Sequence, residues 1–230
     1  MRLGLLGGTF NPVHRCHLEI AAQSRSRLSL DRILFIPSGD PPHKPPGSLA
    51  PAHDRMEMLR LAIDGHSAYA LSDVELRQPG KSYSIDTVRS LRKEFGPTTD
   101  LFFLIGLDAF VDLPNWREPE DLLTLCSFTV LSRPGRAFRD LAMFPLLPSL
   151  DATILADLDT GRRGRYDVRF ARGTSVIFLA PPPCTVSASD IRARIRGGRP
   201  TGNLLPAPVE SYIIRRGLYR EKTDRTGVEV

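Results

Sequence analysis

A glycine pair at the end of an apolar run is the feature that most constrains the fold of this chain. Residues 3–6 have the composition of a buried β-strand, and Gly7 and Gly8 follow at once. Residues 17–28 then show the periodicity of a helix. Glycine lets a ligand approach the backbone, and a helix N-terminus presents free N–H groups and a positive dipole end. The stretch GGTFNPVHRCH, residues 7–17, therefore predicts a phosphate site after a first strand.

Two histidines, His14 and His17, lie three residues apart at the expected start of this helix. Side chains at that spacing lie on the same side of a helical turn. A lone histidine usually caps a helix or packs, and imidazole also binds zinc. No third ligand lies nearby in the sequence, whereas a pair that faces phosphate also accounts for the glycines. We therefore interpret His14 and His17 as phosphate contacts.

Strand-like and helix-like segments alternate along the rest of the chain, which predicts parallel strands joined by crossover helices. The expected strands are residues 2–6, 32–36, 68–74, 101–105, 128–131 and 175–179. The expected helices are residues 17–28, 53–64, 84–95, 118–125, 189–196 and 207–215. Residues 136–174 have the least regular pattern and are expected to form an insertion or flexible excursion. We expect one domain over residues 1–220, with a helical C-terminal part at about 187–220 and a polar, frayed tail at residues 221–230.

Loops that carry glycines, cations, hydroxyls or acids follow the expected strands. They comprise residues 7–17, 37–44, 106–108, 132–135 and 186–192. In an open parallel sheet, ligands bind beyond the carboxyl ends of the strands. Because these loops belong to that edge, we expect them to build one composite site.

The late stretch VSASDIRARIRGG, residues 186–198, has the pattern of a capped helix. Ser187 is the expected N-cap, Asp190 would complete a capping box, and Gly197 supplies the stop. This structural interpretation leaves Arg192 unexplained. A cation beside a donor-rich helix N-terminus suits an anionic ligand, so we assign Arg192 a functional role.

Three further residues are candidates for ligand contact. Asp108 follows an apolar strand, where an acid can cap the next turn or bind ribose hydroxyls. Trp116 is the only tryptophan; it fits a core position and a ligand platform equally well. Lys44 follows a stiff Pro-Pro-His run and can reach an anionic ligand.

The composition excludes some classes of protein. No apolar run approaches the roughly 20 residues that a membrane helix needs. The first strand begins without a signal-like segment, so we expect a cytoplasmic protein.

The net charge of the chain is +5. The sequence lacks the compact basic block with interleaved aromatics that favours nucleic-acid binding, so this charge suits a polyanionic small molecule better. Residues 162–172, the densest basic stretch, resemble a solvated loop. Cys16, Cys126 and Cys184 have no metal-like spacing and favour free thiols in a reducing compartment.

Taken together, these motifs resemble those of bacterial nicotinate-mononucleotide adenylyltransferases, members of the nucleotidylyltransferase superfamily. That superfamily carries a GGTFxPxHxGH signature and a late ISxTxIR-like signature, which here read GGTFNPVHRCH and VSASDIR. The resemblance continues through PPHK, SYSIDT, GLDAFVDLPNW, SRPG and LLPAPVESYIIRRGLYR, and so covers about residues 1–220. The first and last signatures specify nucleotidyl transfer, and the middle segments favour the pyridine-nucleotide branch.

The resemblance implies a fold, a reaction and a set of site residues. The fold is an α/β fold of the nucleotidylyltransferase type, with a Rossmann-like parallel sheet and helices on both faces. ATP, carrying Mg²⁺, reacts with nicotinate mononucleotide to give nicotinate adenine dinucleotide and pyrophosphate, without a covalent intermediate or a dedicated metal cluster. The implied catalytic residues are His14, His17 and Arg192. The implied ATP-binding residues are Gly7, Gly8, Thr9, Phe10, Gly106, Asp108, Ser187 and Ile191, and the implied acceptor-binding residues are Lys44, Thr87, Trp116 and Arg133.

One departure from the signature concerns Cys16, which replaces the glycine between the two histidines. Its side chain would narrow the space near the nucleotide, so that either the adenine shifts or the sulfur points toward the helix packing face. Rival interpretations are another adenylyl or cytidylyl transferase, with nicotinamide mononucleotide or phosphopantetheine as acceptor, and a non-catalytic nucleic-acid-binding protein. Neither a nucleic-acid partner nor a membrane is expected, and a homo-oligomer is left open.

Overall fold

A seven-stranded sheet in the order β3-β2-β1-β4-β5-β7-β6 forms the centre of the protein. The computed structural model describes residues 1–42, 45, 47–170, 173–182 and 184–220. All neighbouring strands are parallel except β6 and β7, which pair antiparallel. The strands are β1 (Arg2–Gly8), β2 (Arg32–Pro37), β3 (Tyr69–Leu71), β4 (Asp100–Gly106), β5 (Ser127–Leu131), β6 (Arg165–Arg169) and β7 (Ser175–Leu179).

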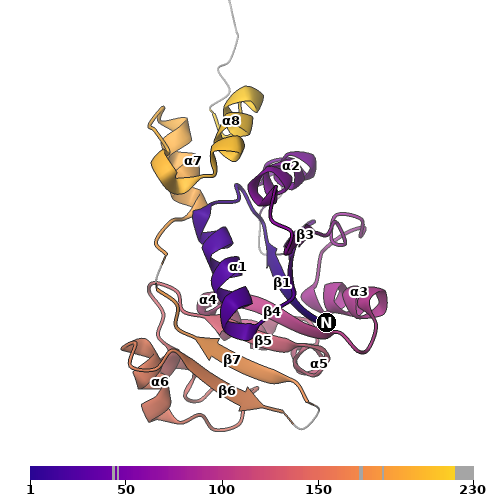
Figure 1. Cartoon of the computed structure of the whole chain (residues 1–230), viewed down its shortest axis with the longest axis vertical. Helices are drawn as coiled ribbons and strands as arrows, with labels where there is room; N and C mark the ends of the chain where they lie inside the picture. Colours follow the sequence, from indigo (N-terminus) through magenta and orange to yellow (C-terminus); the bar gives the residue numbers. More distant parts are fainter. Residues whose placement is uncertain (43–44, 46, 171–172, 183, 221–230) are drawn as a thin grey trace, which may run out of the picture.

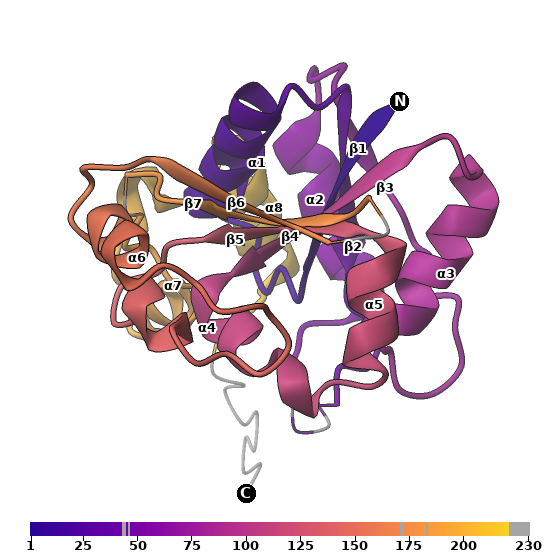
Figure 2. The ribbon, with the colours of Figure 1, turned by 90° about the horizontal axis from the view of Figure 1, so that it is seen from below.

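Helices cover both faces of this sheet (Figures 1 and 2). Figure 2 shows the sheet nearly edge-on, with α1 and α2 on one side and α3, α4, α5 and α6 on the other. The helices are α1 (Arg15–Leu28), α2 (Ala52–Ile63), α3 (Ser84–Phe95), α4 (Leu107–Val111), α5 (Pro119–Leu125), α6 (Ala152–Asp159), α7 (Ala188–Arg196) and α8 (Ala207–Arg216). Three 3-10 turns are η1 (Leu113–Asn115), η2 (Phe138–Leu141) and η3 (Gly202–Leu204). Of the helices described, none is long and apolar enough to span a bilayer.

The central strand β1 contributes to two separate cores because successive side chains point to opposite faces. Leu3 and Leu5 pack with the cluster that includes α3 and α5, whereas Leu6 packs with the cluster that includes α1 and α2. At Gly4 a Cβ atom would lie only 2.6 Å from the Cδ1 of Ile33. The sheet is therefore buried on both faces, as the nearly continuous apolar strands predict.

The C-terminal helix α8 is fastened to α2 by a buried carboxylate. Asp54 of α2 accepts hydrogen bonds from the Oη of Tyr212 at 2.7 Å and from the Nε of Arg216 at 3.1 Å. Just beyond α8, the Oη of Tyr219 lies 2.9 Å from the Oδ1 of Asn11. The end of the described chain thus supports the loop that follows β1.

The structure confirms the predicted α/β fold with a mostly parallel sheet, and it corrects the prediction for residues 136–174 and the basic loop at 162–172. The region between β5 and β7 contains η2, α6 and the edge strand β6. Asp151 caps α6 by accepting hydrogen bonds from the backbone N–H groups of Thr153 and Ile154. β6 was missed because its sequence, RYDVR, is mostly polar and only Val168 is buried. The predicted frayed tail, 221–230, lies outside the described residues.

Candidate active site

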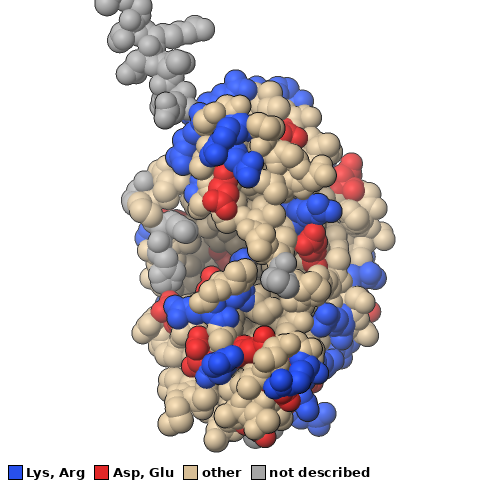
Figure 3. All heavy atoms as spheres, turned by 90° about the vertical axis from the view of Figure 1, so that its left-hand side faces the viewer, with Lys and Arg blue, Asp and Glu red and all other residues tan. Residues whose placement is uncertain are grey.

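A cavity of about 490 Å³ opens at the carboxyl ends of the central strands. It lies where β1 and β4 are neighbours, the point at which the strand order reverses direction. Open α/β sheets bind ligands at such switch points. Segments that follow β1, β2, β4 and β5 all line the cavity, so the structure brings these four predicted loops together. Figure 3 shows a hollow on one face of the molecule, with Lys and Arg side chains along its lower edge.

Gly7 forms part of the cavity wall although it belongs to the central strand β1. It is exposed, and a Cβ atom built on it would meet nothing within 4 Å. Gly8 differs, since its Cβ would touch the ring of Phe10 at 3.4 Å. Phe10 itself is buried, with a φ of 45°. The backbone at Gly7 is therefore open to a ligand, whereas the buried ring of Phe10 packs under Gly8 and supports the loop that follows β1.

Substitution of Gly7 should separate binding from folding. We expect Gly7→Val to leave the thermal midpoint nearly unchanged, because the side chain enters empty space. It should nevertheless lower kcat/KM by roughly 10- to 100-fold, since a ligand displaced from this wall loses alignment. Gly4→Ala is the matched control: its Cβ would overlap Ile33, so we expect lost stability of about 1–3 kcal/mol. Calorimetry and steady-state kinetics on both variants measure these effects. A Gly7→Val variant that lost as much stability as Gly4→Ala would contradict the prediction.

The His14 and His17 rings lie with their centroids 3.8 Å apart at the start of α1. The backbone N–H of His14 donates to the Nδ1 of His17 at 3.2 Å. A neutral His17 therefore carries its proton on Nε2. His17 lines the cavity, and the ring of Phe10 packs edge-on against it at 4.9 Å. His14 is buried, and its Nδ1 has no hydrogen-bond partner among the described residues.

Burial and a neighbouring cation keep both imidazoles neutral at neutral pH. Burial, with a smaller contribution from the nearby Arg133, lowers the pKa of His14 to about 4. Burial also brings the pKa of His17 well below its usual value, with smaller contributions from His14 and Arg133. At neutral pH the pair consequently carries no positive charge, and each ring can donate one N–H hydrogen bond.

The buried His14 predicts a pH-dependent loss of stability. The ordinary pKa of a histidine is 6.5, and that of His14 in the folded protein is about 4. Between these values the unfolded chain binds more protons, so stability falls as the pH falls. Relative to His14→Gln, the unmodified protein should lose about 3 kcal/mol of unfolding free energy between pH 7 and pH 4. Denaturant titrations at several pH values measure the difference, and parallel curves for the two proteins would contradict it.

Arg133 and Asp108 lie side by side on the cavity wall. The Nε of Arg133 is 3.7 Å from the Oδ1 of Asp108, and this buried Nε has no hydrogen-bond partner among the described residues. A Cβ on Gly106 would come within 2.5 Å of Asp108 Oδ1 and 2.9 Å of Arg133 Nε. Glycine at position 106 thus lets both side chains reach the cavity, where Arg133 can bind an anion and Asp108 can accept hydrogen bonds.

An aromatic group lines another part of the cavity. Trp116 packs edge-on against Phe103, at 6.2 Å between ring centroids, and also lines the cavity. It therefore packs against the core and also forms part of the cavity wall, while its contact with a ligand stays a prediction. The guanidinium carbon of Arg117 lies 5.1 Å from the centre of the Tyr83 ring, and both residues line the same cavity. These rings provide a flat surface on which a planar ligand group can stack.

Thr87 does not line the cavity. It is fully buried, and its hydroxyl donates to the Oε1 of Glu75 at 2.9 Å. Glu75 does line the cavity, and burial raises the pKa of its carboxyl. Sequence reasoning missed Glu75 because an isolated acid in a polar segment is ordinarily a surface residue. Thr87 can therefore influence a ligand through Glu75, while direct contact stays a prediction.

The late motif lies beside the cavity rather than in its wall. Ser187 caps α7 by accepting a hydrogen bond from the backbone N–H of Asp190 at 3.0 Å, as predicted; within the described chain, the reciprocal bond to Asp190 is not present. Arg192 donates through Nη1 to the backbone oxygen of Asn11 at 2.8 Å, which ties α7 to the loop after β1. The side chain of Ile191 is fully buried, which leaves only its backbone for a ligand. The predicted contact of Lys44 lies outside the described residues.

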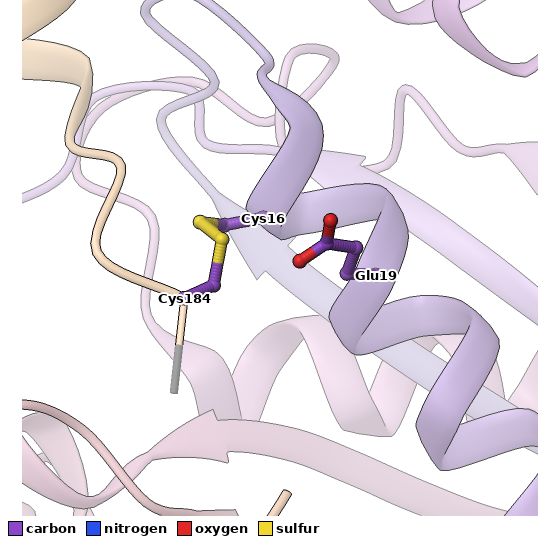
Figure 4. A group of neighbouring side chains, drawn as sticks. All are labelled: Cys16, Glu19 and Cys184. Carbon is purple, nitrogen blue, oxygen red and sulfur yellow. A yellow bond between two sulfur atoms is a disulfide. The ribbon is translucent and has the colours of Figure 1, made fainter. Parts of the chain in front are cut away.

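The prediction of three free cysteines was wrong. Cys16 and Cys184 form a disulfide with a Cα–Cα distance of 5.6 Å (Figure 4). Cys126 is free and buried. Spacing along the chain could not reveal a pair separated by 168 residues. Cys16 is buried and does not line the cavity, so its sulfur points away from the wall that the sequence suggested it would narrow. Ligand atoms of Cys16, Glu19 and Cys184 all lie within 4.8 Å of one another, but the disulfide uses both sulfurs.

The chain is similar to known proteins over nearly its whole length. Residues 5–194 match the cytidylyltransferase-like family. A probable nicotinate-nucleotide adenylyltransferase of Pelobacter propionicus is 42% identical over 221 residues, which cover 96% of this chain and 99% of the relative. That of Geobacter metallireducens is also 42% identical, over 95% of this chain and 98% of the relative. The chain belongs to the nicotinate-nucleotide adenylyltransferase family.

Solved structures of the adenylyltransferase family share this fold. The Plasmodium falciparum nicotinic acid mononucleotide adenylyltransferase complexed with NaAD superimposes with a TM-score of 0.69 at 19% identity, over 95% of this chain and 97% of the other. A Vibrio parahaemolyticus structure described as a putative nicotinate-nucleotide adenylyltransferase gives a TM-score of 0.60 at 19% identity, over 96% of each chain. The family's Rossmann-like architecture is thus present here, with the cavity at its switch point.

Proposed function

We propose that this chain transfers the adenylyl group of ATP to nicotinate mononucleotide, giving nicotinate adenine dinucleotide and pyrophosphate. The observation that carries the proposal is the cavity at the β1–β4 junction. It joins a wall of open backbone, imidazole and guanidinium groups to a wall of aromatic rings. Its volume of about 490 Å³ falls in the range of small-molecule sites, roughly 300–1,000 Å³. A site that must align two nucleotides needs both kinds of wall.

The ATP half is supported by the donors of the loop that follows β1. The neutral His17 accepts the N–H of His14 at its Nδ1 and presents Nε2–H toward the cavity. The open backbone at Gly7 and the first turn of the 14-residue helix α1, through His17, form parts of the same cavity wall. Donors held in place before the reaction stabilise the charge that develops on a transferring phosphoryl group. In this proposal His17 contacts the transferred phosphate, while Asp108 holds the ribose.

The acceptor half is supported by Trp116, Tyr83 and the start of α3. The two rings can bracket a pyridine ring by stacking. Ser84 opens α3 and lines the cavity, so first-turn N–H groups of this 12-residue helix lie near the ligand. These donors suit the carboxylate of a nicotinate ring. Lys44 and Thr87 stay predicted contacts.

The phosphate of the mononucleotide is a sufficient nucleophile at neutral pH, so the chain need not supply a general base. Catalysis then consists of aligning two anions and neutralising the transferred group. The two imidazoles fit this scheme, since groups that stay neutral over a wide pH range are suited to donate hydrogen bonds to phosphate oxygens. In this proposal the attack is in line and forms no covalent intermediate.

Magnesium enters this reaction as part of the substrate MgATP. Among the described residues, the one cluster of potential metal ligands is Cys16, Glu19 and Cys184; it lies outside the cavity wall, and its two sulfurs form the disulfide. Mg²⁺ prefers oxygen ligands and commonly binds through substrate phosphates. We therefore assign no step to a magnesium ion held by the protein.

Nicotinamide mononucleotide is the second candidate acceptor, because Glu75 lines the cavity and can accept a hydrogen bond from an amide. The decisive assay measures pyrophosphate release from MgATP with nicotinate mononucleotide, nicotinamide mononucleotide and phosphopantetheine compared side by side. We expect the highest kcat/KM with nicotinate mononucleotide. Faster turnover of either other acceptor, or inertness toward all three, would overturn the proposal.

A further inference from the structure

The Cys16–Cys184 disulfide joins the first motif, which lines the cavity, to the late motif, which lies outside the cavity wall and which the family resemblance assigns to ATP. Cys16 is the second residue of α1 and lies between His14 and His17 in sequence. Cys184 lies three residues before Ser187, the N-cap of α7. Figure 4 shows the bond running from the first turn of α1 to the extended segment that leads into α7. The disulfide therefore connects the N-terminal regions of two helices that are distant in sequence.

Few other contacts hold this segment in place. In the described part of residues 181–186, the one hydrogen bond runs from Ser132 Oγ to the backbone oxygen of Pro181, at 3.3 Å. Beyond it, Arg192 contacts the backbone of Asn11 and Ile191 is buried in the core. The body of α7 is thus anchored by packing, and so is Val186, the residue directly before its N-cap. Cys184, two residues earlier, is held through its disulfide. Loss of the disulfide would free the approach to Ser187 without detaching α7.

We propose that Cys16 and Cys184 form a reversible thiol–disulfide exchange site that controls the affinity of the enzyme for ATP. The inference rests on the function proposed above. In the disulfide form, the N-termini of α1 and α7 are held together and the ATP half is ordered before binding. In the dithiol form, ATP binding must order residues 184–186, which lead to Ser187, and that ordering costs affinity.

The exchange needs only a small thiol or disulfide as its co-reactant. Two molecules of a low-molecular-weight thiol reduce the bond: the first thiolate attacks one sulfur and forms a mixed disulfide, and the second releases it. The protein gains two electrons and two protons as two thiols, and the reagent leaves as its own disulfide. Cys184 is partly exposed, so a small reagent can approach the bond from that side, whereas Cys16 is buried.

Cys126 takes no part in this exchange and provides the internal control. It is fully buried, its Sγ lies 3.6 Å from the backbone oxygen of Leu122, and burial raises the pKa of its thiol to about 12. Thiolate is the reactive form in exchange, so a thiol with such a pKa is inert at neutral pH. The redox response of the intact protein can therefore be assigned to the Cys16–Cys184 pair.

The first test counts thiols without reference to activity. Protein purified under air is denatured and alkylated before and after treatment with dithiothreitol, and its mass is measured. We expect one alkylated cysteine before reduction and three after it. Oxidised glutathione added to the reduced protein should restore the count of one. Three alkylated cysteines without reduction, or failure to re-form the bond, would overturn the inference.

The second test measures ATP affinity in both states by calorimetry, together with KM and kcat for pyrophosphate release. A zinc chelator is present, so that Cys16, Glu19 and Cys184 cannot hold a metal in the reduced form. We expect reduction to raise the Kd and KM for ATP by about 3- to 10-fold, with a smaller change in kcat. Cys184→Ser and Cys16→Ser should match the reduced protein and ignore dithiothreitol, whereas Cys126→Ser should still respond.

The outcomes separate this inference from the proposed function. Equal ATP affinity in the two redox states, or tighter binding after reduction, contradicts the exchange site even if pyrophosphate is released. Absence of pyrophosphate release in both states contradicts the proposed function. In that case the calorimetric Kd values still decide whether the disulfide controls nucleotide affinity.

Discussion

His17→Ala is expected to lower kcat by roughly 100- to 1,000-fold, the usual cost of removing one preorganised donor to a transition state. The KM for ATP should change far less. The imidazole lines the cavity, and its Nδ1 already accepts the N–H of His14, so Nε2–H is the group left to meet the transferred phosphate. That contact strengthens as charge develops on the phosphoryl group, which is why the loss appears mainly in kcat.

Rapid-quench measurement of a single turnover tests this expectation at the chemical step. His66→Ala is a suitable control, because His66 is exposed and does not line the cavity. It should retain the parental rate. A His17→Ala variant that turned over near the parental rate, or that lost only ATP affinity, would contradict the role proposed for His17.

Trp116→Ala should raise the KM for nicotinate mononucleotide by roughly 10- to 100-fold, since stacking of a base on an aromatic side chain contributes about 1–3 kcal/mol. The KM for ATP should stay close to the parental value. The ring of Trp116 lines the cavity while its edge packs on Phe103, so its orientation is set before the acceptor binds. A planar pyridine ring can then stack on Trp116 without the entropy cost of ordering that side chain on binding.

Trp116→Phe is the matched variant, because it keeps an aromatic face and removes only part of the stacking area. Its KM should lie between the parental and Trp116→Ala values. Circular dichroism and a thermal melt guard against a folding defect, since Trp116 also borders the core that contains Phe103. A Trp116→Ala variant whose KM changed for ATP rather than for the mononucleotide would place the acceptor elsewhere.

The disulfide changes the interpretation of the departure at Cys16. From the signature alone, a cysteine in the place of glycine threatens the space next to a nucleotide. In the structure its sulfur is bonded to Cys184 and does not line the cavity. Cysteine at position 16 thereby links the first motif to the late motif. We therefore expect its effect on catalysis to depend on whether the disulfide is formed, and not on steric overlap with the nucleotide.

Local sequence determined much of the fold because the responsible interactions are short in range. Apolar runs, glycines at strand ends and helical periodicity act within a few residues, so residues 84–95 were predicted with the observed bounds of α3. The same reasoning placed Gly7, His17, Asp108 and Arg133 at one edge of the sheet, since parallel strands bring their carboxyl ends together. Where the local signal is mostly polar, as in β6, prediction failed because strand pairing at the edge supplies the missing order.

Tertiary structure alone decided which side chains meet. The hydroxyl of Thr87 faces Glu75 rather than the cavity, Arg192 holds the backbone of Asn11, and Cys16 bonds to Cys184. Each of these contacts depends on how helices pack on the sheet and how loops close between them, and no local periodicity records that packing. The sequence by itself thus determined the strand–loop–helix phosphate motif and the edge on which the site lies, because glycine and helix termini act locally. The pairings that hold and shape that site arise only when distant segments pack together.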